Sequence, residues 1–449
     1  MYYNNILEVI GNTPLVKINK LNPNPRVLML VKLEFLNPGG SIKDRIGSLM
    51  IERAEKMGKL KKGGTIVEPT SGNTGVGLAL VATVYGYKSI FVMPDKMSEE
   101  KRNLLRAYGA KVVITPTAVS PEDERSYYQV SDRLTKEISG AYKPDQYSNP
   151  ANPISHYKTT GPEIWEQTEG KVTHVVIGLG TGGTVTGVGR FLKEKNPKIK
   201  IIGVDPVGSV YYDYFKTKKM PKLFKTYKVE GVGEDFLPKT IDFSVVDEVV
   251  QVSDKDCFLT ARRLAQEEGI LSGGSSGMAL FAARKVSKKL KTGIMVVILP
   301  DSGRNYLTKF YNDDWMRDFG FLEETRDDIS SLLNKKLHFI TIISTASPQE
   351  AIDLLRKYNI SQMPVVEGKK VVGTICERIL IQSLFDKPKI PVRVSEIMDS
   401  EFISLPKNSS LNQLSQALSR KELVVITDNK GKPIDVLTRI DLLGHLTDL

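Results

Sequence analysis

The residues best suited to chemistry lie in the segment NPGGSIKDRIG, residues 37–47, where two glycines and a serine precede Lys43. A lysine acts as a nucleophile or a base only after it loses its proton, and burial promotes that loss. The glycines let the backbone approach a flat ring closely, a freedom that a surface lysine does not need. The segment alone leaves two interpretations open: a reactive lysine before an amphipathic helix at 46–58, or an exposed loop lysine.

A second candidate is the segment EPTSGNTG, residues 68–75, at the end of a short apolar run. Hydroxyl, amide and backbone N–H groups between a strand and a helix suit a carboxylate anion. A plain helix cap is the alternative, but a single capping residue would be enough for that role. Four polar residues are present instead, namely Thr70, Ser71, Asn73 and Thr74.

The glycine-rich segment GLGTGGTVTG, residues 178–187, follows the strand-like run THVVI. Backbone N–H groups of such a loop can hold a phosphate. The segment also meets the pattern G-x-G-x-x-G at Gly178, Gly180 and Gly183, and Asp205 ends the next strand-like run. A dinucleotide-binding dehydrogenase is therefore a rival interpretation, and this segment alone does not decide between the two.

The segment LSGGSSGMAL, residues 271–280, meets the G-x-S-x-G pattern of a hydrolase nucleophile, centred on Ser275. That interpretation needs a histidine later in the chain. Only His338 and His445 follow, and both lie in the C-terminal region with a different composition. We therefore do not expect a hydrolase.

Strand-like and helix-like runs alternate over residues 1–320 and would position these four segments. Continuous apolar runs of strand length favour parallel strands that are covered on both faces. Their alternation with helices predicts an α/β fold with a parallel sheet. The strand-like runs lie within 66–73, 89–94, 111–116, 173–180, 198–206 and 295–301, and helices are expected at 74–86 and 99–109.

The C-terminal part of the chain contains an internal repeat. Residues 340–380 resemble residues 402–443, and each copy has a strand, a helix opened by a serine, two strands around a turn and a helix. A charged segment without a strand signal precedes them. We expect a catalytic domain at 1–322, a linker at 323–334 and a module at 335–449, with repeats at about 335–388 and 389–449.

The composition excludes several classes of protein. The net charge is +11, but the lysines are spread along the chain without a nucleic-acid-binding motif, so no nucleic-acid partner is expected. No apolar run approaches the roughly 18 residues of a membrane span. Cys257 and Cys376 form no metal-binding pattern and suggest reduced structural thiols. Without a signal-peptide pattern, we expect a cytoplasmic protein with no membrane partner and no metal.

Five motifs in order resemble the fold-type II pyridoxal-phosphate enzymes of the β-replacement family, which includes cysteine synthases and cystathionine β-synthases. They are GNTPLV (11–16), SIKDR (41–45), PTSGNTG (69–75), GTGGT (180–184) and GGSSG (273–277). The dinucleotide interpretation explains only one of the five. The resemblance implies a fold-type II α/β domain with two parallel-sheet subdomains, followed by an α+β pair of CBS repeats.

Three further stretches are most similar to the cystathionine β-synthases: DQYSNPANPISHY (145–157), EGVGEDFLP (230–238) and ILPDSGRNYLTKF (298–310). The implied reaction condenses L-serine with L-homocysteine to cystathionine, with release of hydrogen sulfide from cysteine as a further activity. A cysteine synthase or a cystathionine synthase that uses O-acetylserine remains an alternative. A nucleotide-sensing protein with an inactive enzyme domain is a third interpretation, which the complete motif set opposes.

The resemblance also implies roles for individual residues. Lys43 would bind pyridoxal phosphate covalently and move the α-proton of the substrate. Glu230 would orient the amino group of homocysteine, and Tyr147 would line the same pocket. The other expected site residues are Asn73 at the ring hydroxyl, Gly180, Thr181, Gly182, Gly183 and Thr184 at the phosphate, Ser275 at the ring nitrogen, and Thr70, Ser71, Thr74 and Gln146 at the substrate carboxylate.

The CBS repeats resemble modules that bind adenosine-containing ligands through a hydroxyl residue and an aspartate. The second repeat keeps both, as Thr438 and Asp441, whereas the first has Cys376 and Ile379. One site for S-adenosylmethionine or an adenine nucleotide is thus expected, with a ligand-free dimerising module as the alternative. We expect a homodimer or higher oligomer. Because GNTPLV begins at residue 11, no haem-binding extension and no haem are expected.

Overall fold

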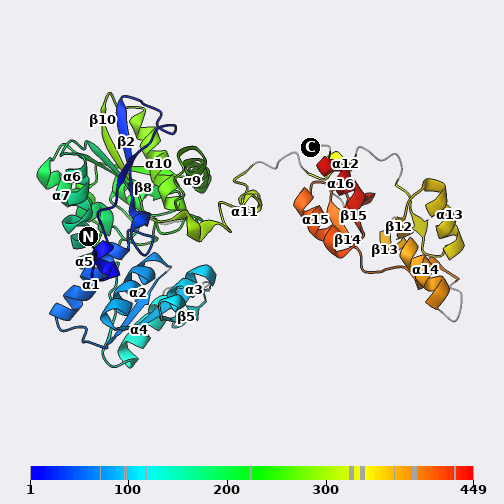
Figure 1. The fold of residues 1–449 in the computed structure, drawn as a ribbon, viewed down its shortest axis with the longest axis horizontal. Helices are drawn as coiled ribbons and strands as arrows, with labels where there is room; N and C mark the ends of the chain where they lie inside the picture. Colours follow the sequence, from blue (N-terminus) through cyan, green and yellow to red (C-terminus); the bar gives the residue numbers. More distant parts are fainter. Residues whose placement is uncertain are drawn as a thin grey trace. The chain divides into compact units, whose positions relative to one another are not determined.

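The computed structural model describes residues 2–70, 72–95, 97, 99–116, 119–120, 122–221, 225–322, 328–333, 339–368, 370–386, 392–428 and 431–447. The chain divides into two compact units, residues 1–322 and 323–449 (Figure 1). The boundaries expected for the linker and for each repeat remain predictions.

The larger sheet of the first unit has six strands in the order β1-β2-β10-β7-β8-β9, and all neighbours are parallel except β1 and β2. Its two central runs, VLMLVKL in β2 and GIMVVIL in β10, pair from Val27 with Gly293 to Leu33 with Leu299. Apart from the ion-paired Lys32 in β2, these runs are apolar, because helices cover both faces. The strands are β1 (Leu15–Lys17), β2 (Val27–Leu33), β7 (His174–Gly178), β8 (Lys200–Pro206), β9 (Glu248–Val252) and β10 (Gly293–Leu299).

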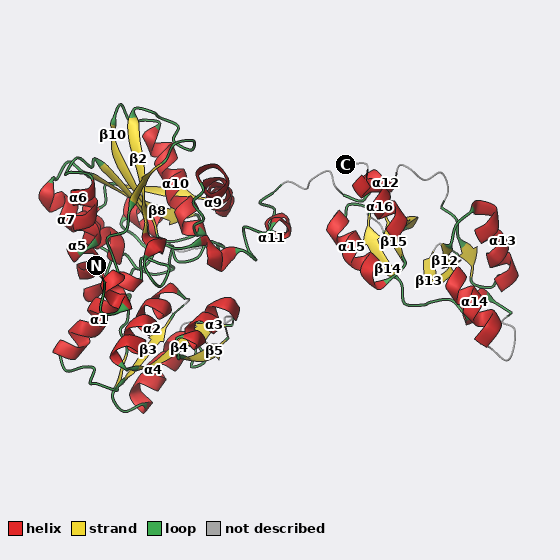
Figure 2. Ribbon diagram, in the orientation of Figure 1, coloured by secondary structure: helices red, strands yellow, loops and turns green. Residues whose placement is uncertain are grey.

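Helices lie on both sides of this sheet, with α6 and α7 on one side and α9 and α10 on the other (Figure 2). Two separate apolar cores result. One contains Val185 and Val188 of α7, and the other contains Leu264 of α9 and Met278 of α10. The helices of this part are α5 (Ala151–Lys158), α6 (Thr160–Gln167), α7 (Gly183–Lys195), α8 (Tyr211–Thr217), α9 (Asp254–Glu268), α10 (Gly274–Ser287) and α11 (Asp313–Asp318).

The smaller sheet has four parallel strands in the order β5-β4-β3-β6. Its core includes Ile66 and Phe91 from the strands and Ile46 and Leu78 from the helices. Two parallel-sheet subdomains are therefore present, as the motifs predicted, with an antiparallel β1 added to one. The elements are β3 (Thr65–Pro69), β4 (Lys88–Pro94), β5 (Lys111–Thr115), β6 (Ala141–Tyr142), α1 (Asp44–Lys56), α2 (Asn73–Tyr85), α3 (Glu99–Ala107) and α4 (Tyr127–Glu137).

The second unit contains two copies of the strand, helix, strand, strand, helix order that the repeat predicted. Each first helix begins with a capping box, formed by Ser347 and Glu350 in one copy and by Ser410 and Gln413 in the other. The first copy comprises β11 (Ile342–Ile343), α13 (Pro348–Tyr358), β12 (Gln362–Glu367), β13 (Lys370–Cys376) and α14 (Glu377–Asp386). The second comprises β14 (Ile403–Pro406), α15 (Leu411–Arg420), β15 (Leu423–Thr427), β16 (Pro433–Thr438) and α16 (Arg439–Thr447).

A short helix, α12 (Ser330–Leu333), lies inside the segment expected to be a linker. Leu332 of this helix and Ile329 just before it are buried with Leu414 and Val424 of the second repeat. This part of the segment thus contributes to the core of the second unit. In the described part of the chain, no helix is both long and apolar enough to cross a bilayer.

Candidate active site

A cavity of about 690 Å³ lies where the carboxyl ends of strands from both sheets of the first unit meet. The loops after β3, β7 and β10 contribute Asn73, Thr181 and Asp301 to its wall. Open parallel sheets bind ligands at this edge. The predicted residues that line the cavity are Lys43, Asn73, Thr74, Gln146, Tyr147, Thr181, Glu230 and Ser275.

Lys43 lies in the wall of the cavity, immediately before α1. Burial lowers its pKa to about 8, against the opposing effects of Glu234 and Asp301. Glycines bring α1 and α2 into backbone contact here. A Cβ at Gly47 would lie 2.7 Å from the carbonyl oxygen of Gly77, and one at Gly77 would lie 2.7 Å from that of Lys43. The close approach sets the lysine beside the start of α2.

Arg45, two residues after this lysine, fixes the start of α1 through a buried ion-pair network. Its Nε and Nη2 donate to the carboxylate of Glu34 at 2.7 and 2.9 Å, and its Nη1 donates to Glu163 at 2.6 Å. Lys32 donates to Glu163 at 2.7 Å from the opposite side. Bidentate pairs of this kind are geometrically specific, so they restrict where the preceding lysine can lie.

The segment 68–75 forms the turn from β3 into α2. The Thr74 hydroxyl donates to Gln146 Oε1 at 2.6 Å, which joins two residues predicted at the substrate carboxylate. Thr70 has a structural role, because its hydroxyl accepts from the N–H groups of Gly72 and Gly75 at 3.1 and 3.2 Å. It is not among the described residues that line the cavity. Ser71 lies outside the described residues.

The segment 180–184 leads into the N-terminus of α7. Gly182, which caps this helix at φ +84°, provides no side chain to its first N–H groups, so they are suited to an anion. A Cβ on Gly183 would lie 1.8 Å from Asn152 Oδ1, so only glycine fits there. Thr184 meets the buried His156 at 3.2 Å, and burial keeps the pKa of that ring well below its ordinary value. A neutral ring thus supports the loop.

Ser275 lies in the first turn of α10 and lines the cavity, although its side chain is largely buried. It presents a neutral hydroxyl to the cavity. Three further groups belong to the same site: the amine of Lys43, the anion site at the N-terminus of α7 and the amide of Asn73. These groups match the aldehyde, phosphate, ring nitrogen and ring hydroxyl of pyridoxal phosphate, so the residues present fit that cofactor.

Glu230 lies in the same cavity between two lysines that sequence reasoning missed. Its carboxylate accepts from Lys101 and Lys309. Burial alone would raise the pKa of Glu230, but the charges of the two lysines outweigh it and hold the pKa below its ordinary value. The carboxylate is therefore charged and already paired, so a substrate amino group would have to compete with both lysines for it.

Glu234 and Asp301 are two further cavity residues that were not predicted, although both lie in quoted stretches. Glu234 is hydrogen-bonded to Tyr147, and burial raises its pKa to about 7. Asp301 accepts from Asn73 at 2.9 Å and from Tyr306 at 2.7 Å. Their position in stretches that match the family was the available signal, but the stretches alone do not distinguish a cavity carboxylate from a solvated one.

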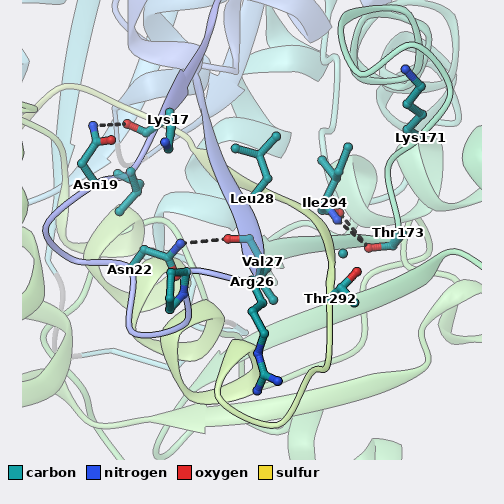
Figure 3. Close-up of a pocket in the computed structure, with 13 residues that line it drawn as sticks. Lys17, Asn19, Asn22, Arg26, Val27, Leu28, Lys171, Thr173, Thr292 and Ile294 are labelled. Atoms are coloured by element: carbon teal, nitrogen blue, oxygen red, sulfur yellow. Dashed lines mark hydrogen bonds between the residues drawn. The ribbon is translucent and has the colours of Figure 1, made fainter.

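A second pocket, of about 600 Å³, lies at the opposite edge of the larger sheet, where β2, β7 and β10 begin (Figure 3). Thr173 and Leu28 belong to its wall, and none of the predicted site residues does. Three cations line it, Lys17, Arg26 and Lys171, and the last two point away from each other (Figure 3). The pocket therefore offers no convergent set of groups comparable to those of the first cavity.

The hydroxyl and carboxylate predicted in the second CBS repeat are adjacent. Thr438 donates to Asp441 Oδ2 from its Oγ1 at 2.7 Å and from its N–H at 2.8 Å. In the first repeat the corresponding position carries Cys376, a buried thiol. The two repeats therefore differ at the position predicted to carry a hydroxyl.

Comparison with known families gives two matches. The model described as pyridoxal-phosphate dependent enzyme matches residues 6–301. The CBS domain model matches residues 329–386 and 394–448. The first match covers about two thirds of the chain and includes the cavity residues up to Asp301.

Two relatives match almost the whole chain, and a solved structure matches about two thirds of it. The chain is 41% identical to cystathionine beta-synthase of Dictyostelium discoideum, with 98% of this chain and 92% of that protein covered. It is 37% identical to cystathionine beta-synthase of Saccharomyces cerevisiae, with 98% and 97% covered. A solved hydrogen sulfide-producing enzyme from Fusobacterium nucleatum is 39% identical with a TM-score of 0.63, covering 68% of this chain and 100% of its own.

Proposed function

The chain belongs to the family of pyridoxal-phosphate dependent enzymes, and from this premise we propose that it condenses L-serine with L-homocysteine to form cystathionine. The observation that carries the proposal is the cavity in which the amine of Lys43, its pKa lowered by burial, lies with the polar start of α2. The reaction is a β-replacement, in which the thiol of homocysteine takes the place of the serine hydroxyl. Relatives named for this activity support the choice of substrates.

The cavity residues would hold the cofactor as follows. Pyridoxal phosphate, when bound, supplies an electron sink that makes the α-proton of an amino acid acidic. Lys43 would hold it covalently, Asn73 would meet the ring hydroxyl and Ser275 the ring nitrogen. The N–H groups and hydroxyls of residues 180–184 would hold the phosphate.

The first substrate is bound and deprotonated by residues of two loops. Thr74 and Gln146, with Ser71 as a further candidate, would bind the carboxylate of serine through hydroxyl and amide groups. Lys43 takes the α-proton as general base, which requires its amine to be neutral. A pKa near 8 makes a sizeable fraction neutral at mildly alkaline pH. The same amine returns the proton to the α-carbon after the thiol has added.

Cysteine in place of serine would release hydrogen sulfide by the same steps, because a thiol then leaves instead of a hydroxyl. The hydrogen sulfide-producing enzyme among the solved structures supports this further activity. O-acetylserine, as the first substrate of a cysteine synthase or a cystathionine synthase, would use the same lysine. These alternatives differ from the main proposal in the leaving group or in the nucleophile.

The remaining parts of the proposal concern the C-terminal repeats and the state of the protein. We propose that the second CBS repeat binds an adenosine-containing ligand through Thr438 and Asp441, supported by the contact between them. We also propose a homodimer or higher oligomer in the cytoplasm. The absence of haem remains a prediction, and a visible spectrum of the purified protein tests it.

Product analysis by mass spectrometry tests the proposed reaction. Serine or O-acetylserine is supplied with homocysteine or sulfide, giving four pairs. The proposal predicts that serine with homocysteine gives cystathionine at the highest rate. Cysteine from O-acetylserine and sulfide, with little cystathionine from either donor, would identify the chain as a cysteine synthase instead.

A further inference from the structure

Four carboxylates line the cavity among the described residues, and the mechanism proposed above assigns a proton transfer to none of them. They are Glu230, Glu234, Asp235 and Asp301. Glu230 is held by two lysines, and Asp301 accepts from Asn73 and Tyr306. Asp235 is exposed. Glu234 is hydrogen-bonded to Tyr147, which also lines the cavity.

The backbone around Glu234 is fixed. Its N–H donates to Ser209 Oγ at 3.1 Å, and its carbonyl oxygen accepts from the N–H of Val210 at 3.1 Å. The preceding N–H, of Gly233, donates to the carbonyl oxygen of Leu179 at 2.7 Å. The carboxylate is therefore held in the cavity wall by the elements that also carry the glycine-rich loop.

The pKa of Glu234 lies near neutral pH. Burial raises its pKa to about 7, while the hydrogen bond from Tyr147 and the charge of Lys43 lower it and Asp235 raises it. An acid of this pKa exists in both forms near neutral pH, which is what a group that first gives and then takes a proton requires. The ionisable groups whose charges act on it or feel its charge are Lys43, Asp235, Tyr127, Tyr128, Tyr147, Tyr211 and Tyr227.

We infer that Glu234 transfers protons to and from the groups that leave and attack the β-carbon of the substrate. It first protonates the serine hydroxyl as it leaves and then accepts the thiol proton of homocysteine. The inference rests on the proposed function and adds a catalytic residue to it. The C–O bond breaks with its electrons on oxygen, and the Glu234 carboxylic acid supplies the proton, so water departs. The thiol then gives its proton to the Glu234 carboxylate while a sulfur electron pair forms the C–S bond. Glu234 returns to its starting form.

With Glu234 acting at the β-carbon, Lys43 serves only the α-carbon. Lys43 takes the α-proton and must return it to the α-carbon at the end. If the same amine also protonated the departing hydroxyl, it would need another proton before that last step. A second carrier at the β-carbon keeps the two proton transfers separate, so serine plus thiol gives product plus water with no other reactant.

The leaving group provides the test. Acetate leaves O-acetylserine as a stable anion and needs no proton, and hydrosulfide attacks as an anion. Glu234→Gln should therefore lower kcat for serine with homocysteine by about 100-fold or more, the usual scale of general acid–base catalysis. The same variant should retain the reaction of O-acetylserine with hydrosulfide within about threefold. Glu248→Gln, which changes an exposed carboxylate outside the cavity lining, is the matched control and should leave both reactions unchanged.

Two readouts complete the experiment. The rate of the serine half-reaction is followed by cofactor absorbance without homocysteine. In the wild type this rate should fall as the pH rises above about 7, and in Glu234→Gln this fall should be absent. Infrared difference spectra of the two proteins without substrate should contain a protonated carboxyl band that titrates with a midpoint near pH 7. Circular dichroism and cofactor absorbance establish that the variant is folded and loaded.

The outcomes separate the inference from the proposed function. Equal losses with both donors, or no loss with serine, overturn the role of Glu234 while leaving cystathionine synthesis intact. A difference spectrum between the two proteins that lacks this band also overturns it, because the buried Asp44, Glu68 and Asp205, whose pKa values burial also raises to about 7, cancel in the difference. A wild-type protein that makes no cystathionine from serine contradicts the proposed function, and the inference with it.

Discussion

Asn73 Nδ2 donates a hydrogen bond of 2.9 Å to Asp301 Oδ2, which links the first residue of α2 to the loop after β10. The two residues follow strands of different sheets, so this bond joins the two subdomains at the wall of the cavity. Tyr306 donates to the same oxygen at 2.7 Å. The Asn73 amide is thereby oriented before any ligand binds.

Replacing Asp301 with alanine should lower kcat/KM by about ten- to a hundredfold, because the Asn73 amide loses the acceptor that orients it. Such a loss corresponds to the roughly 1.5–3 kcal/mol of a hydrogen bond to a charged group. Tyr306→Phe keeps the Asn73 contact and should have the smaller effect. Steady-state kinetics check this, and equal effects of the two variants would contradict an orienting role.

Replacing Arg45 with methionine should destabilise the first unit by about 3–5 kcal/mol, because it leaves the buried Glu34 without its partner. Urea unfolding monitored by circular dichroism measures the change. Arg190→Met, which removes a partly exposed pair with Asp242, is the control and should cost about 0–1 kcal/mol. Similar values for the two variants would mean that the Arg45 network does not fix α1.

The stability of the cofactor-free protein should rise with pH above about 8. Burial lowers the pKa of Lys43 from 10.5 to about 8, so between these values the unfolded chain binds more protons at this residue. Below pH 8 both states carry the charge, and burying it reduces stability. The Lys43 contribution should therefore increase by up to ~1.4 kcal/mol per pH unit. Comparing the free energies of unfolding of the wild type and Lys43→Met across this pH range isolates the Lys43 contribution. Parallel curves for the two proteins would contradict the prediction.

Calorimetry with S-adenosylmethionine and with ATP tests the second CBS repeat. At least one ligand should give a binding heat with the wild type, and Asp441→Ala should abolish it because the carboxylate next to Thr438 is lost. Glu377→Ala, an exposed carboxylate of the first repeat, should bind as the wild type does. No heat from either ligand with the wild type would favour a dimerising or stabilising module.

The main features of the site could be predicted because they are local. Three short segments carry these features: Lys43 with its glycines, the polar start of α2 and the glycine-rich loop. Each has fewer than about ten residues and follows an apolar run. Parallel strands bring such loops to one edge of a sheet, so the cavity followed from the strand pattern. The two capping boxes of the repeats are local in the same way.

The long-range pairings could not be predicted. Glu230 meets Lys101 and Lys309, which lie 129 and 79 residues away in sequence, so its charge partners depend on the folded chain. Glu234 lies only four positions away, yet its pKa shifts in the opposite direction, because burial raises both values and only Glu230 has two lysines that outweigh this effect. Thr70 carries a side chain suited to substrate but turns it to the backbone of its own loop.

Synthesis in deuterium oxide tests the central claim most directly, that Lys43 moves the α-proton while serine and homocysteine become cystathionine. The wild type is supplied with both amino acids in deuterium oxide, and the product is examined by mass spectrometry. The account predicts cystathionine with deuterium at the α-carbon derived from serine, and no product from Lys43→Ala that retains wild-type circular dichroism. Unlabelled cystathionine, or full synthesis by Lys43→Ala, would contradict it.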